Sequence, residues 1–162
     1  MATYSLESLA AQEQSLVVPH FTSADAFTLG VHIREQTLAE YPTKVVAIRI
    51  TLATGQILFS TVTGSPAIPD SETWLARKAA AVLRFGVSTL HLGKKIRAKG
   101  LKGDRVSEAY PVDDREYACH GGGFPIRVKG VEGVIAVVVV SGLVQEEDHR
   151  LAVEGIEWFL KQ

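Results

Sequence analysis

The amino-acid sequence predicts an α+β fold in which helices flank an antiparallel sheet. Two pairs of strand-like segments, each joined by a turn that contains glycine, indicate two β-hairpins. Segments with helical spacing of apolar residues lie before, between and after these hairpins. Hairpins that alternate with helices are typical of a sheet whose faces are covered by helices.

The composition fits a single domain over residues 1–162. Apolar residues make up 46% of the chain, which is enough for a core without disulfides. The formal charge of −1 does not indicate a polyanion partner, and the single cysteine suits a reducing compartment. No secretory signal is visible, and the longest apolar run, Val134–Val140, is far shorter than the ~20 residues of a membrane span. We therefore expect a cytoplasmic protein without a membrane partner.

Two helices are predicted in the first part of the chain. A short amphipathic helix covers residues 5–15, and a short edge strand is expected where Val17, Val18 and Phe21 flank Pro19. The second helix is expected to begin at a cap formed by Ser23 or Asp25 and to run to about Glu40. Its inner stripe consists of Ala26, Leu29, Ile33 and Leu38.

The first hairpin is predicted over residues 45–62. Alternation places one set of apolar residues on a single face of its first strand: Val46, Ile48, Ile50 and Leu52. A turn at residues 53–55 leads into the second strand, 56–62.

The second part of the chain predicts three helices and another hairpin. Asp70 and Ser71 begin a helix that runs to about Phe85, and further helices cover 88–99 and 145–160, with an irregular segment at 100–115. The hairpin joins strands 124–129 and 134–140. The latter strand is apolar on both faces, so it should be central and covered on both sides. The whole pattern suggests a profilin-like or PAS-like domain.

A glycine-rich segment, Ala118–Pro125, is the densest functional signal. Gly121, Gly122 and Gly123 allow positive φ and can direct backbone N–H groups towards an oxyanion, with His120 beside them. The alternative is a flexible bend before a strand. Cys119 is interpreted as a small core residue rather than a nucleophile paired with its neighbour.

A second signal lies on the helix that begins at Asp70. Trp74, Lys78 and Phe85 share one face, and Arg77 lies beside them. Two cations beside an indole could clamp the carboxylate or phosphate of a ligand. The alternative is a solvated helix edge from which the cations extend into water.

A third signal is Ser141 followed by an acidic first turn and His149. The helix dipole explains the acids, and Glu146 can pair with Arg150 four residues later. His149 continues the inward stripe of its helix, so it should face the sheet. It is either a core histidine bonded to a backbone carbonyl or a residue of a cleft at this edge of the sheet.

Other functions have little support in the sequence. The basic run from Lys94 to Arg105 contains no interleaved aromatic residues, so it predicts a solvated surface rather than a nucleic-acid partner. No histidine or cysteine spacing indicates a metal site, and no motif specifies catalytic residues.

Three segments resemble the HbpS/GlcG-like superfamily, and more closely its small intracellular branch of uncharacterised proteins. They are Asp70–Val82, the HGGGFP stretch at 120–125, and the VSGL stretch at 140–143 followed by Asp148 and His149. The resemblance implies a profilin-like domain that forms homo-oligomers, and some members bind or degrade haem. It carries over onto the following residues as ligand-binding candidates: Trp74, Arg77, Lys78, His120, Gly121, Gly122, Gly123, Ser141, Asp148 and His149.

Three functional hypotheses follow. The first is an oligomeric module that binds a small anionic, largely planar ligand, with haem indicated by the resemblance. The second is an enzyme in which His149 and His120 act as acid and base while Arg77 and Lys78 hold an anionic substrate. The third is a protein-interaction scaffold in which the glycine segment and the Trp74 helix form a subunit interface.

Overall fold

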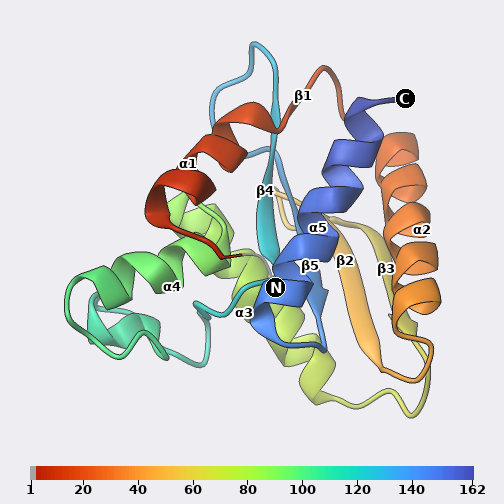
Figure 1. Cartoon of the computed structure of the whole chain (residues 1–162). Helices are drawn as coiled ribbons and strands as arrows, with labels where there is room; N and C mark the ends of the chain where they lie inside the picture. Colours follow the sequence, from red (N-terminus) through yellow and green to blue (C-terminus); the bar gives the residue numbers. More distant parts are fainter. Residues whose placement is uncertain (1–2) are drawn as a thin grey trace.

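The computed structural model describes residues 3–162 and contains, within them, five α-helices, one short 3-10 helix and five strands (Figure 1). In chain order these are α1 (Leu6–Ser15), β1 (Val17–Val18), α2 (Ser23–Glu40), β2 (Val46–Leu52), β3 (Ile57–Thr63), α3 (Asp70–Phe85), α4 (Thr89–Ala98), η1 (Val106–Glu108), β4 (Gly123–Val128), β5 (Ala136–Ser141) and α5 (Gln145–Leu160). The α+β prediction is confirmed.

The strands form one sheet in the order β1-β4-β5-β2-β3. Both expected hairpins are present as antiparallel pairs, β2 with β3 and β4 with β5, and β5 also pairs antiparallel with β2. The short edge strand β1 runs parallel to β4, so the sheet is mixed rather than purely antiparallel. The expected central position of the apolar strand is confirmed, because β5 lies between β4 and β2.

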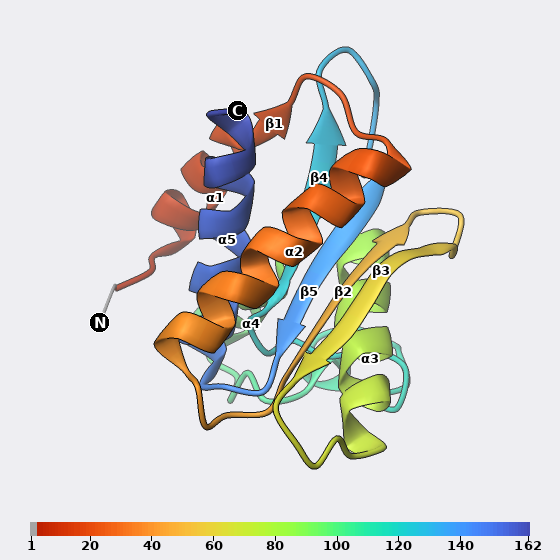
Figure 2. The ribbon, with the colours of Figure 1, turned by 90° about the vertical axis from the view of Figure 1, so that its right-hand side faces the viewer.

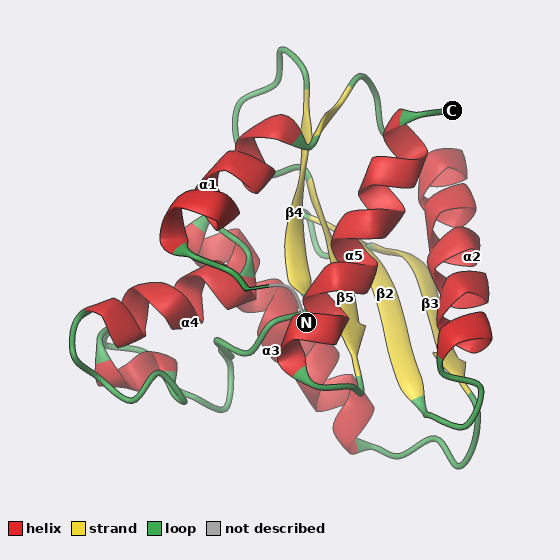
Figure 3. Ribbon diagram, viewed as in Figure 1, coloured by secondary structure: helices red, strands yellow, loops and turns green. Residues whose placement is uncertain are grey.

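Helices cover both faces of the sheet, as Figures 2 and 3 show. On one face, α2 and α5 pack on the side chains of Ile48, Val138 and Val140. On the other face, α3 packs on Val137 and Val139. Alternate residues of β5 therefore enter two different cores, which explains why this strand is apolar throughout.

Two details of α2 differ from the prediction. Its N-cap is Thr22 rather than Ser23 or Asp25, and the Asp25 side chain instead accepts a hydrogen bond from the Thr22 backbone in a capping box. The inner stripe includes the buried Thr37, while Leu38 is only half-buried. The hydroxyl of Thr37 donates to the carbonyl of Ile33, which removes the cost of burying it.

Cys119 is buried in a small apolar cluster with Leu92 and Ile96, as expected of a core residue. Burial raises the pKa of its thiol to about 11, so it is a poor nucleophile.

Among the described residues, no helix combines the length and apolar character that a bilayer span requires. The cytoplasmic location stays a prediction.

Candidate functional site

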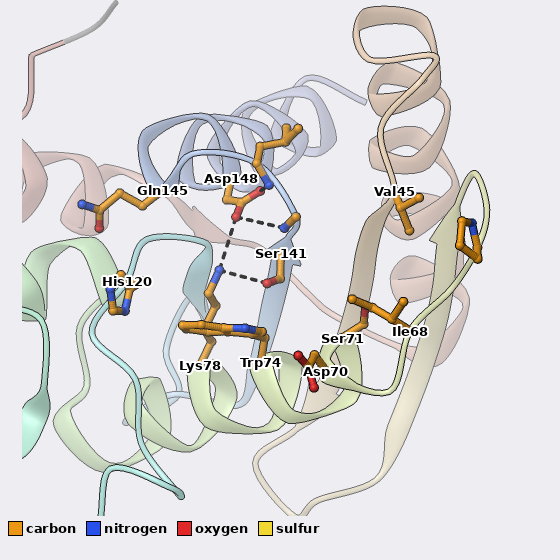
Figure 4. A pocket seen from close by; sticks show the side chains of 13 residues that line it. Val45, Ile68, Asp70, Ser71, Trp74, Lys78, His120, Ser141, Gln145 and Asp148 are labelled. Carbon is orange, nitrogen blue, oxygen red and sulfur yellow. Dashed lines mark hydrogen bonds and ion pairs between the residues drawn. The ribbon is translucent and has the colours of Figure 1, made fainter.

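A hollow of about 620 Å³ lies at the end of the sheet where β5 leads into α5 (Figure 4). Its volume is in the range of small-molecule sites. The start of α3, the β5–α5 turn and the segment before β4 surround it. The lining residues are Val45, Pro66, Ile68, Asp70, Ser71, Trp74, Lys78, His120, Ser141, Gly142, Leu143, Gln145 and Asp148.

Lys78, Ser141 and Asp148 form a buried polar cluster beside this hollow. The Nζ of Lys78 donates to the Val140 carbonyl (3.3 Å), to Oγ of Ser141 (3.2 Å) and to Oδ2 of Asp148 (3.3 Å). An ammonium group has three N–H donors, so protein acceptors use all of them. The alternative of a solvated helix edge is wrong for Lys78, because only 2% of the residue is exposed.

Asp148 ties the turn after β5 to this cluster. Its Oδ2 accepts from the Gly142 amide (3.2 Å) and its Oδ1 from the Leu143 amide (3.0 Å). The helix dipole, predicted to explain this acid, is therefore not the whole reason for its position. The carboxylate joins the β5–α5 turn to α3 across the sheet end.

Burial acts on both charges of the pair. It lowers the pKa of Lys78 and raises the pKa of Asp148 to about 6, because each charged form loses its hydration. The attraction between the two groups works in the opposite direction on each. As an ion pair the two charges compensate, so this side of the hollow carries little net charge.

Trp74 and His120 form an aromatic corner of the hollow. Their ring centroids are 5.3 Å apart and the ring planes meet at 87°, which is the edge-to-face geometry that aromatic rings favour. Burial, and then the nearby charge of Lys78, lower the pKa of His120, so its imidazole is neutral at pH 7. Within residues 3–162, Nδ1 of His120 is sealed from solvent and has no hydrogen-bond partner, which leaves Nε2 to reach a ligand.

Arg77 does not line the hollow. Its guanidinium lies 4.6 Å from the Trp74 ring centroid and donates to the carbonyls of Asp114 (2.8 Å) and Tyr117 (3.4 Å). These contacts hold the irregular segment before β4 against α3. Both cations of the expected anion clamp are thus already engaged within the protein.

The glycine segment is packed rather than open. The Gly121 amide donates to Oε1 of Gln145 (3.1 Å), and the Gly123 amide donates to Oγ1 of Thr89 (2.9 Å). Gly122 has φ +131°, and a Cβ there would overlap the Val140 carbonyl oxygen. The flexible-bend alternative is wrong, since all three glycines are buried. An oxyanion nest would need amides that are free, and two of the three are used.

His149 lies outside the hollow. It is fully buried on α5, and its Nε2 is 2.7 Å from Oε1 of Gln12 on α1. Its ring packs edge-on against Tyr4 and Phe124. It is therefore a core histidine, with a side-chain amide in place of the expected backbone carbonyl. The structure does not bring it together with His120.

The buried position of His149 predicts a pH-dependent stability. Burial lowers its pKa to about 4, whereas the unfolded chain has a pKa of about 6.5. The unfolded state therefore binds the proton that the folded state excludes, and stability falls as pH drops from about 6.5 towards 4. Urea unfolding measures this effect. Between pH 7 and pH 4.5, the free energy of unfolding of His149→Gln should fall by roughly 2–3 kcal/mol less than that of the parent chain. Equal losses in the two proteins would contradict this.

Some lining residues were not expected from the sequence. Gln145 both lines the hollow and accepts from Gly121, yet as the first residue of α5 it carries no chemical signature. Val45 and Ile68 come from loops whose positions depend on the sheet.

The expected pair of Glu146 with Arg150 is wrong. Arg150 instead pairs with Glu147 and Glu154 on its own helix and with Glu40 on α2.

Comparison with known sequences gives consistent matches over nearly the whole chain. A family model described as haem degrading protein HbpS-like matches residues 21–157, which include the three segments of the resemblance, and it confirms that resemblance. A UPF0303 protein of Streptomyces avermitilis is 41% identical over 156 residues, covering 96% of this chain and 91% of the relative. The UPF0303 protein YBR137W of Saccharomyces cerevisiae is 39% identical, covering 97% of this chain and 85% of the relative.

Solved structures have the same fold. The crystal structure of the Ybr137w protein matches with a TM-score of 0.90 at 39% identity, over 98% of this chain and 90% of that one. The crystal structure of a PduOC:heme complex matches with a TM-score of 0.60 at 20% identity, over 87% of this chain and 94% of that one. At that identity the second match shows a shared fold alone.

Proposed function

Because the chain belongs to the HbpS-like family of haem-degrading proteins, we propose that it binds a small, largely planar ligand in the hollow between α3 and the β5–α5 turn. Haem or a related compound is the ligand that the family indicates. The heme complex of PduOC, which has the same fold, supports this choice. The names of the closely matching relatives specify no activity.

The observation that carries the proposal is the aromatic corner of Trp74 and His120 at the hollow. The indole offers aromatic surface to a planar ligand on the side that Arg77 does not cover, and a neutral imidazole offers a ring nitrogen. Apolar side chains of Val45, Ile68 and Leu143 complete the lining beside them. Ligand sites commonly combine such apolar surface with a few polar groups.

The residues of this hollow fit a haem in part. His120 would be the residue to hold its iron, and Trp74 would contact the ring. The carboxylates of a haem have a poorer match, because Lys78 is paired with Asp148, and Asp70 adds a further negative charge to the lining. Arg77 and Lys78 are both bonded to protein acceptors. These contacts favour a ligand with little net charge over the anionic ligand that the sequence suggested.

A haem titration followed at the Soret band tests the proposal. We expect a saturable change that is weakened at least about tenfold in His120→Ala, because the iron would lose a ligand nitrogen. Trp74→Ala should also weaken binding. His20→Ala is the matched control, because the His20 side chain is 67% exposed and bonds Asp25 instead.

Three results would count against the proposal. A spectrum without saturable change would remove haem as the ligand. Equal binding by the parent chain, His120→Ala and Trp74→Ala would remove the hollow as the site. Weaker binding by His20→Ala alone would point to a different histidine.

Self-association is a second part of the proposal. Outer strand β3 has no further strand beside it within the described sheet, and Ile57 at its start and Phe27 on α2 are 52% and 62% exposed. Unpaired edges and exposed apolar side chains favour contact with another copy. Light scattering that gave the mass of one chain at micromolar concentration would contradict it.

The enzyme alternative has less support, since His149 and His120 do not share a hollow.

A further inference from the structure

A second hollow, of about 480 Å³, lies between α1, the turn from α3 to α4, and β4. It shares no lining residue with the first hollow. Three residues that carry chemistry line it, and each comes from a different element: Glu13 from α1, His91 from α4 and Arg127 from β4. None of them was identified as functional from the sequence.

Glu13 and His91 form a fixed pair. The Nδ1 of His91 lies 3.0 Å from Oε2 of Glu13, and Oε1 of Glu13 accepts from the Ser88 amide at 2.7 Å. The two side chains are only 10–11% exposed. A carboxylate can only accept hydrogen bonds, so Nδ1 of His91 carries the proton and donates a hydrogen bond to Glu13. In the neutral imidazole, this leaves the lone pair on Nε2.

The free nitrogen of His91 has access to the hollow. Its Nε2 has no hydrogen-bond partner within residues 3–162, and it is not among the nitrogen atoms sealed from solvent, unlike Nδ1 of His120 and of His149. Arg127, which lines the same hollow, donates from Nη2 to the Gly86 carbonyl at 2.8 Å. Its Nε and Nη1 have no partner in the described part of the chain, so they remain as donors.

We propose that this second hollow binds inorganic phosphate. An anionic phosphate oxygen would accept from the Arg127 guanidinium, and a phosphate hydroxyl would donate to Nε2 of His91. A singly protonated phosphate supplies both functions at once. Sulfate has the same shape but no hydroxyl at neutral pH, so it can satisfy only the arginine. Both oxygens of the Glu13 carboxylate accept hydrogen bonds within the protein, from the Ser88 amide and from His91, and no ion pair joins Glu13 to Arg127 within residues 3–162.

Titration of the full chain with inorganic phosphate, followed by the imidazole resonances, tests the site. The chain has five histidines, and the signal that is lost in His91→Gln identifies His91. We expect a saturable shift of this signal at millimolar phosphate. Methyl phosphate loses its second proton at a pKa of about 6, so at pH 7 it mostly lacks the hydroxyl and should bind more weakly than inorganic phosphate. Sulfate should bind about tenfold more weakly, because one charge-assisted hydrogen bond is missing.

Arginine variants complete the test. Arg127→Gln should weaken phosphate binding about tenfold, and Arg127→Lys, which keeps the charge, should lie between Arg127→Gln and the parent chain. Arg115→Gln is the matched control, because this side chain is 90% exposed and pairs with Asp113. The proposal is overturned by any of three results: no saturable shift, equal affinity for sulfate and phosphate, or unchanged affinity in a folded Arg127 variant.

Discussion

Asp148→Ala is expected to lower the free energy of unfolding by about 3–5 kcal/mol. Lys78 and Asp148 are almost completely buried, and the substitution leaves the Lys78 ammonium without its carboxylate. The amides of Gly142 and Leu143 lose their acceptor at the same time. Urea or guanidinium unfolding at pH 7 measures the loss.

A double-mutant cycle isolates the ion pair. Adding Lys78→Met to Asp148→Ala removes the stranded charge, so the second substitution should cost little or restore stability, with a coupling of about 2 kcal/mol. Losses that simply add would show that the two groups do not interact. Glu72→Ala is the matched control on the same helix. Glu72 pairs with Arg49 at the surface with 67% of its side chain exposed, so the change should be below about 1 kcal/mol.

Gly122→Ala should also be strongly destabilising, by about 3–5 kcal/mol. The positive φ disfavours any residue with a Cβ, and the added carbon would overlap the Val140 carbonyl oxygen on β5. Lys78 would be disturbed as well, since its Nζ would be 2.9 Å from the new carbon. Unfolding monitored by circular dichroism gives the difference in stability.

Gly130→Ala separates conformational strain from lack of space. Gly130 has φ +79°, but apart from its own chain neighbours no atom of residues 3–162 lies within 4 Å of the position that its Cβ would take. The Gly130→Ala variant should therefore lose only about 1 kcal/mol of unfolding free energy, which is the cost of the backbone conformation itself. If the two variants were equally stable, the glycine segment would not be a packing element. A similar comparison of haem binding would show whether the packing of this segment also supports the Trp74–His120 hollow.

Much of the secondary structure follows from local signals. The helices α3 and α5 begin and end where the sequence predicts, because acidic residues occupy the first turn of each and Gly86 follows α3. The central place of β5 follows from its apolar character on both faces. The cap of α2 was misassigned, because Thr22, Ser23 and Asp25 are all good capping residues and only the backbone conformation distinguishes them.

The candidate site could be predicted only in part. Trp74, Lys78, His120, Ser141 and Asp148 were singled out from three separate segments, and the structure brings them to one hollow. Arg77 and His149 were singled out by the same reasoning, but their side chains satisfy other partners, at Asp114 and Gln12. A residue's type and helical spacing show which face it occupies, but not which group from a distant element will meet it there.

The sequence by itself therefore determined the α+β class, most element boundaries, the two hairpins and the residue types available for binding, since these depend on neighbours along the chain. Tertiary structure alone decided the strand order, the burial of Lys78 against Asp148, the packing of the glycine segment and the pairing of Glu13 with His91. Each of these depends on contacts between segments that lie far apart in the sequence. Such long-range contacts are set by the packing of the whole chain, because no local preference encodes them.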